Sequence, residues 1–148
     1  MQLLRGVQPG DGRHLPELRR RTCAAATANP ARMNYRHAYH AGNFADVHKH
    51  AALTAILLHL RKKDAPFALI DTHAGRGLYD LSGDEARRSG EVVDGVAKLA
   101  GHVARTPALA TYLDVVRGFG PQRYPGSPLI AAELLRPQDR LVAMEKHA

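Results

Sequence analysis

Residues 67–77 read Phe-Ala-Leu-Ile-Asp-Thr-His-Ala-Gly-Arg-Gly. The first four form a short continuous apolar run, which predicts a strand buried on both faces. The run ends in Asp71, and Gly75 and Gly77 place a glycine-containing loop directly after it. Further along the chain, Leu141-Val-Ala-Met-Glu145 predicts a second strand that ends in an acid. A Rossmann-like sheet holds a nucleotide-type cofactor in this way, with the loop against the ligand and the acid on its ribose hydroxyls.

The loop after the first strand departs from the common phosphate-binding motifs. It lacks the third glycine of a dinucleotide fingerprint, and the absence of Gly-Lys-Ser/Thr excludes a P-loop. The pattern Asp71-x-x-x-Gly75-x-Gly77 is closer to the loop that binds S-adenosylmethionine (SAM) in class I methyltransferases. About 70 residues lie between the two predicted strands where about 20 are usual, so we expect a helical insert over about residues 80–122. The predicted fold class is α/β, as the start of a Rossmann-like sheet.

Helical patterns surround the two predicted strands. Asn43 is a suitable cap for the first helix, and Ser89 is a possible cap for the second. Thr106 and Ser127 each precede a proline, the signature of a capping residue followed by proline at the first helical position. We therefore expect four helices, over roughly residues 44–62, 91–103, 107–118 and 127–136.

A dense polar run precedes the first helix: Met33-Asn-Tyr-Arg-His-Ala-Tyr-His-Ala-Gly-Asn-Phe-Ala-Asp-Val-His-Lys-His50. A fold has little structural use for so many imidazole, phenol and amide groups in one short stretch. Because such groups titrate, stack and hydrogen-bond, the run is a candidate functional site.

Composition and charge narrow the class of protein. The chain has 148 residues, the size of one ordinary domain, and a single cysteine, Cys23, which rules out an internal disulfide framework and a thiolate-based zinc site. Its apolar runs are too short to span a membrane, and a cytoplasmic protein is the simplest interpretation. The net charge of +7 suggests a polyanionic partner such as nucleic acid.

Residues 1–32 differ from the rest of the chain. They hold six arginines against Asp11 and Glu17, a net charge of +4, whereas residues 33–148 have a net charge of +3. They show no sustained helical or strand period and lack the apolar segment of a secretory signal. We expect this leader to be disordered, or to arise from a start codon chosen upstream of a natural start at Met33.

Five motifs occur along the chain in a fixed order: Tyr35-Arg-His-x-x-His-Ala-Gly-Asn43, Ala45-Asp-Val-x-Lys-His50, Asp71-Thr-His-Ala-Gly75, Tyr124-Pro-Gly-Ser-Pro128 and the acid Glu145. In this order they closely resemble the N-terminal half of the J-type 23S ribosomal RNA methyltransferases (RlmJ), which methylate an adenine N6 with SAM. The resemblance covers residues 33–148, starts at Met33 and includes the helical insert. It implies a class I methyltransferase fold that is monomeric when intact.

The resemblance also implies roles for individual residues. Family contacts with SAM fall on His50, His73, Ser127 and Glu145. Tyr35 matches a residue that contacts the RNA substrate, and His37 and Lys49 match positions near the reacting base, where they would support the reaction. Five of these residues also have an ordinary structural alternative: Ser127 as a helix cap, His50 as a buried core histidine, His73 as a turn residue, Tyr35 as a packed aromatic, Glu145 as an exposed strand end.

One part of the family's active site is missing from the sequence. Enzymes that methylate adenine N6 hold the amine with an Asp/Asn-Pro-Pro-aromatic turn, and the nine prolines of this chain include no Pro-Pro pair. The family's sheet has seven strands, of which two are clear here. We therefore expect a truncated chain that contains no catalytic residue, binds SAM poorly and does not methylate RNA alone. Apolar sheet surface should then be exposed.

Two other functions stay open at this point. A non-catalytic RNA-binding fragment is supported by the charge of +7 and by Tyr35, Arg36 and Tyr39. A metal-dependent hydrolase would use the pair His48-x-His50, but residues two apart on a helix point in nearly opposite directions and cannot chelate one ion together.

Overall fold

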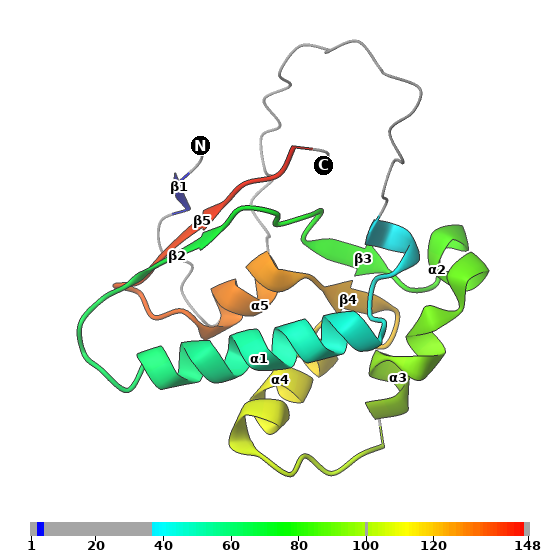
Figure 1. Cartoon of the computed structure of the whole chain (residues 1–148), viewed down its shortest axis with the longest axis horizontal. Helices are drawn as coiled ribbons and strands as arrows, with labels where there is room; N and C mark the ends of the chain where they lie inside the picture. The colour runs from blue at the N-terminus through cyan, green and yellow to red at the C-terminus, as the bar shows by residue number, and fades with distance from the viewer. Residues whose placement is uncertain (1–2, 5–36, 100, 147–148) are drawn as a thin grey trace.

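The computed structural model describes residues 3–4, 37–99 and 101–146, and its centre is a short three-stranded sheet (Figure 1). β2 (Ala68–Asp71) and β5 (Arg140–Ala143) are parallel neighbours, with Ala68 opposite Arg140 and Asp71 opposite Ala143. β1 (Leu3–Leu4) pairs antiparallel with the other edge of β5, which gives the order β1-β5-β2. The carboxyl ends of β2 and β5 therefore lie side by side, as the two-strand prediction requires.

Helices pack on one face of this sheet. α1 (Phe44–Leu60) and α5 (Ser127–Leu134) lie against each other, α5 also contacts β5, and α4 (Pro107–Gly118) packs on α1 (Figure 1). The buried core joins these helices to the sheet. Its largest fully buried apolar or aromatic side chains are Tyr112, Tyr124, Leu57 and Ile130.

The opposite face of the sheet is not covered to the same extent. Ile70 in β2 is 59% exposed, whereas Leu141 in β5 is buried in the core. The expectation that the strand after Phe67 is buried on both faces is therefore wrong for the described residues, where exposed and half-buried positions alternate along β2. An apolar run is compatible with burial on two faces, but only the neighbouring elements decide whether the second face is covered.

Residues 78–125, between the glycine loop and α5, combine strands and helices. β3 (Leu78–Asp80) and β4 (Arg123–Pro125) form a separate antiparallel pair, with Tyr79 opposite Tyr124. Between them lie α2 (Asp84–Ser89), η2 (Glu91–Asp94), α3 (Val96–Leu99) and α4. Because β3 and β4 are paired, the start and the end of this segment lie side by side.

The helix predicted over residues 91–103 is not continuous. It divides into η2 and α3 at Gly95, and Val103 is 90% exposed. Gly95 crosses the entry to α1 so closely that a Cβ atom there would clash with the Gly42 carbonyl and the Asn43 backbone. The Val96 N–H donates to the same Gly42 carbonyl at 2.8 Å, so this contact replaces a helical hydrogen bond.

The helix starts follow the sequence in two cases and depart from it in two others. Ser89, the possible cap for the helix over 91–103, is instead the last residue of α2, and Gly90 precedes η2. Asn43 caps α1 by accepting from the Asp46 N–H at 2.9 Å, and Thr106 caps α4 by accepting from the Leu109 N–H at 3.2 Å. At α5 the cap is Gly126, and Ser127 is the first helical residue. The interpretation of Ser127 as a helix cap is therefore wrong, because its hydroxyl donates to the Asp71 carboxylate at the end of β2.

The leader lies almost wholly outside the described residues, which include only Leu3 and Leu4 of residues 1–32. Its predicted disorder and the alternative start at Met33 stay predictions. In the described part of the chain, no helix has the length and apolar character needed to cross a membrane.

Candidate functional site

The carboxyl ends of β2 and β5 are tied together by backbone and side-chain hydrogen bonds. Met144 donates its N–H to the Asp71 carbonyl at 2.8 Å, and Ala74 donates to the Met144 carbonyl at 3.0 Å. Beyond them, Glu145 Oε2 accepts from the Gly75 N–H at 2.8 Å. The acid after the second strand is thus held against the glycine loop after the first.

Asp71 is the centre of this end of the sheet. Its Oδ2 accepts from the Ser127 hydroxyl at 2.5 Å, and its Oδ1 accepts from the His73 N–H at 3.1 Å. Ser127 thereby brings the start of α5 to the end of β2. The His73 ring is exposed and lies 2.9 Å from the Thr72 hydroxyl.

The Tyr79 side chain packs against the glycine loop. Its hydroxyl accepts from the Arg76 N–H at 3.2 Å, and a Cβ atom at Gly75 would clash with the same hydroxyl. Gly75 also has a φ of 65°, a conformation that L side chains rarely adopt. The loop therefore needs glycine for two reasons: its backbone conformation and its close approach to Tyr79.

A second group of polar side chains surrounds Asp46 in the first turn of α1. Asp46 Oδ2 accepts from the Gly42 N–H at 3.0 Å and lies 2.9 Å from His37 Nε2, while Lys49 Nζ lies 2.8 Å from Oδ1. The Asp46 side chain is only 1% exposed, whereas the Lys49 side chain is 59% exposed. Asp46 thus holds the two supporting residues, His37 and Lys49, at one place.

The electrostatic balance keeps Asp46 ionised. Burial raises the pKa of Asp46, but the hydrogen bonds and positive charges of His37 and Lys49 outweigh burial and lower the pKa to about 2. The carboxylate is therefore charged at neutral pH inside the fold.

Tyr79 lies between the two groups. Its ring contacts the His37 ring edge-to-face, with centroids 5.1 Å apart. Burial raises the pKa of Tyr79, and the negative charges of Asp46 and Glu145 raise it further. The group around Asp46 and the group at the ends of β2 and β5, with Asp71 and Glu145, therefore lie on either side of Tyr79.

His50 is buried one turn beyond Asp46 and belongs to a chain of hydrogen bonds. Its Nδ1 lies 2.7 Å from the Tyr124 hydroxyl, which lies 3.0 Å from the Tyr112 hydroxyl. Burial lowers the pKa of His50 to about 4, and the nearby carboxylates of Asp46 and Asp71 offset only part of this effect. His50 is therefore a neutral imidazole at neutral pH, close to both groups of the site.

The structure brings most of the candidate residues together. His73, Ser127 and Glu145 meet around Asp71 and Gly75, and His37 and Lys49 meet at Asp46. Tyr35 lies outside the described residues. Sequence reasoning gave no individual role in the site to four buried residues that organise it: Asp46, Tyr79, Tyr112 and Tyr124. Asp46 and Tyr124 lie within the quoted motifs, whereas Tyr79 and Tyr112 lie outside them, where their only signal was a phenol in an otherwise apolar pattern.

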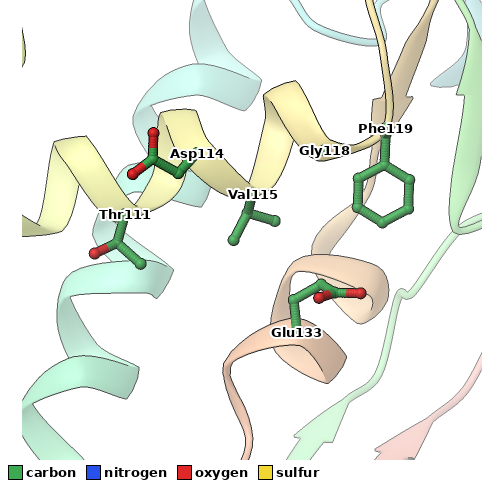
Figure 2. Close-up of a pocket in the computed structure, with 6 residues that line it drawn as sticks. All are labelled: Thr111, Asp114, Val115, Gly118, Phe119 and Glu133. Carbon is green, nitrogen blue, oxygen red and sulfur yellow. The ribbon is translucent and has the colours of Figure 1, made fainter. Parts of the chain in front are cut away.

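Other parts of the described chain offer weaker candidates. No group of three or more histidine, cysteine or acidic side chains among the described residues is placed to hold a metal ion. His48 is exposed and His50 is buried, so the two rings lie on different sides of α1. A hollow of about 420 Å³ between α4 and α5 is lined by Thr111, Asp114, Val115, Gly118, Phe119 and Glu133 (Figure 2). None of the candidate site residues lines it.

Comparison with known proteins identifies the family. The sequence model described as "Ribosomal RNA large subunit methyltransferase D, RlmJ" matches residues 64–148, more than half of the chain. The chain belongs to the RlmJ family. This result confirms the resemblance based on the five motifs.

Curated RlmJ relatives are similar over most of this chain. It is 46% identical over 119 residues to ribosomal RNA large subunit methyltransferase J of Escherichia coli (strain K12), covering 78% of this chain and 42% of the relative. It is 42% identical over 120 residues to the protein of the same name from Haemophilus influenzae, covering 78% of this chain and 43% of the relative. The chain therefore spans less than half the length of these relatives.

A solved structure supports the same assignment at the level of the fold. The crystal structure of protein LPL1258 from Legionella pneumophila matches with a TM-score of 0.65 and 40% identity. The match covers 73% of this chain and 41% of that protein. The mixed α/β architecture is thus shared with that protein and is compatible with a methyltransferase fold.

Proposed function

We propose that this chain supplies the SAM-binding part of a ribosomal RNA methyltransferase that modifies an adenine N6 in 23S rRNA. The observation that carries the proposal is the junction at the ends of β2 and β5, where Glu145 accepts from the Gly75 N–H at 2.8 Å. Parallel neighbouring strands with a glycine loop after one and an acid after the other form the usual place for a nucleotide-type cofactor. Family membership supports the choice of SAM.

The chemistry of these side chains fits the parts of SAM. Glu145 would accept from ribose hydroxyls beside the backbone turn at Gly75 and Gly77. Asp71 offers a carboxylate to the ammonium of the methionine part. Because the Ser127 hydroxyl already donates to Asp71, Ser127 would meet the methionine carboxylate through the backbone at the start of α5. SAM, when bound, supplies the methyl group.

The Asp46 group fits the RNA side of the proposed site. His37 and Lys49 are held at the entry to α1, and the Lys49 side chain is more than half exposed. Exposed cationic side chains of this kind contact RNA phosphates. Tyr35 lies two residues before His37 in the sequence and would stack on a base drawn out of its helix. His73 borders the cofactor at the glycine loop.

The RNA would be bound in the cytoplasm by a protein that is monomeric when intact. The sequence has no Asp-Pro-Pro-Tyr turn to accept the hydrogens of the adenine amine, so we expect no methyl transfer by these 148 residues alone. The net charge of +7 favours RNA binding as a second candidate function. In that case binding would persist without SAM, and deleting residues 1–32 would matter more than changing His73.

Calorimetry with purified protein tests the proposal. We expect SAM to bind with a dissociation constant weaker than about 0.1 mM, near −5 kcal/mol, and Glu145→Gln to weaken it further. Glu133→Gln is the matched control, since this exposed glutamate lies on the α4–α5 hollow (Figure 2). Equal effects of the two substitutions would contradict the assigned cofactor site, and low-micromolar binding would contradict the expectation of an incomplete one.

A further inference from the structure

Hydrogen bonds join the side chains of Tyr112, Tyr124 and His50 in a row, and the hydrogens on their polar atoms can be counted. Burial raises the pKa of both tyrosine hydroxyls, to about 12 for Tyr112, so both keep their hydrogens at neutral pH. His50 is neutral there and carries one ring hydrogen. Three hydrogens must therefore be assigned to two hydrogen bonds, Tyr112–Tyr124 at 3.0 Å and Tyr124–His50 at 2.7 Å.

Any assignment leaves one of the three hydrogens without an acceptor among the described residues, and only one assignment keeps that hydrogen off the two fully buried hydroxyls. If His50 Nδ1–H donated to Tyr124, either the Tyr124 or the Tyr112 hydrogen would have no acceptor among the described residues. Both tyrosines are fully buried, and an unused donor away from water costs about as much as a lost hydrogen bond. If instead Tyr112 donates to Tyr124 and Tyr124 donates to His50 Nδ1, both hydroxyl hydrogens are used.

The remaining hydrogen then lies on His50 Nε2. This atom forms no hydrogen bond with the described residues, yet it is not among the fully buried polar atoms that lack a partner. The His50 residue as a whole is only 6% exposed. Among the polar atoms of these three side chains, Nε2 is thus the one that the described residues leave able to donate to a ligand.

We propose that Tyr112 and Tyr124 are positioning residues that fix His50 as the Nε2–H tautomer, so that His50 presents a hydrogen-bond donor to the methionine carboxylate of the cofactor. This inference rests on the proposed function for the identity of the ligand. His50 feels the charge of Asp71, and Asp71 binds Ser127 at the start of α5. His50 is therefore near the residues proposed to bind the methionine part of SAM.

The tautomer has a chemical consequence for binding. A neutral imidazole can donate or accept at Nε2, and only the donor form is attracted to a carboxylate. A histidine with a mobile hydrogen would present the wrong form for part of the time. The two buried hydroxyls remove this uncertainty without placing a positive charge beside the sulfonium of the cofactor.

Nitrogen NMR of the full chain at neutral pH, without SAM, tests the positioning role directly. The ¹⁵N shifts of the two ring nitrogens distinguish the tautomers, and we expect His50 to show hydrogen on Nε2. A hydrogen on Nδ1 in the unchanged protein overturns the proposal, and this readout does not depend on how well any variant folds.

Two matched substitutions extend the test. Tyr124→Phe removes the donor to Nδ1, so we expect a measurable Nδ1–H population; Tyr112→Phe leaves that donor in place, so the Nε2–H form should persist. With SAM added, Tyr124→Phe should weaken binding several-fold more than Tyr112→Phe. Equal binding by the two variants overturns the link to the cofactor. If no variant and no unchanged protein binds SAM, the proposed function fails while the tautomer still decides the positioning role.

Discussion

Replacing Asp46 with asparagine tests whether this carboxylate is held in its charged form inside the fold. Its pKa is about 2, against an ordinary value of 3.8. A difference of this size corresponds to about 2 kcal/mol of folding free energy, since one pKa unit is worth about 1.4 kcal/mol. Because the folded-state value is the lower one, this contribution is complete above about pH 4 and disappears as the pH falls toward 2.

Urea unfolding followed by circular dichroism measures the effect. At about pH 7, Asp46→Asn should be less stable than the unchanged chain by about 2 kcal/mol, because asparagine keeps an acceptor for the Gly42 N–H but cannot carry the charge that faces His37 and Lys49. The gap should narrow as the pH falls below about 4. The stability of the asparagine variant does not contain the contribution from the Asp46 charge, so acid cannot remove it.

Asp114→Asn is the matched control for the same chemical change. Asp114 pairs with Arg117 on α4, and its side chain is 73% exposed, so the stability should change by less than about 0.5 kcal/mol at every pH. A stability gap for Asp46→Asn that stays constant from neutral pH to acid would show that the charge of Asp46 does not stabilise the fold. A pH-dependent gap of the same size for Asp114→Asn would also contradict the prediction.

Three further predictions concern the glycines and the charge of the chain. Gly75→Ala should destabilise the protein by about 1–3 kcal/mol more than Gly90→Ala, because both glycines have a φ near 65° but only Gly75 faces a hydroxyl where the Cβ would lie; equal losses in thermal unfolding would argue against the Tyr79 contact. Gly95→Ala should disrupt the crossing at Gly42 and increase hydrogen exchange of the Val96 amide, whereas Gly101→Ala, which has open space, should not. RNA binding measured by filter retention should weaken as the salt concentration rises. Residues 1–32 carry a net charge of +4, so their deletion should reduce the slope of log affinity against log salt concentration. An unchanged slope would mean that the leader does not contact RNA.

Local signals in the sequence predicted the elements that local chemistry determines. The helix from Phe44, capped by Asn43, and the helix from Pro107, capped by Thr106, form as expected. The strand after Phe67 and the strand before Glu145 also form and pair in parallel. In each case the signal is a cap, a proline or an apolar run within a few residues of the element.

Long-range contacts account for what the sequence did not predict. Gly95 divides a helix because it meets Gly42, more than 50 residues earlier, and no local pattern contains that contact. Ser127 leaves the cap position to Gly126 because Asp71 takes its hydroxyl. The hydrogen-bond partners of His50 likewise come from β4 and α4. Tertiary pairing, which a single sequence does not display, decided each of these cases.

Locating SAM on the protein tests most directly whether the carboxyl ends of β2 and β5 form the cofactor site. We predict that SAM at several millimolar shifts the backbone amide NMR signals of Gly75, Gly77 and Glu145, while Gly118 beside the α4–α5 hollow stays unchanged (Figure 2). Such a pattern would place the cofactor at the carboxyl ends of β2 and β5. Shifts confined to the hollow, or none at the strand ends at that concentration, would contradict the account.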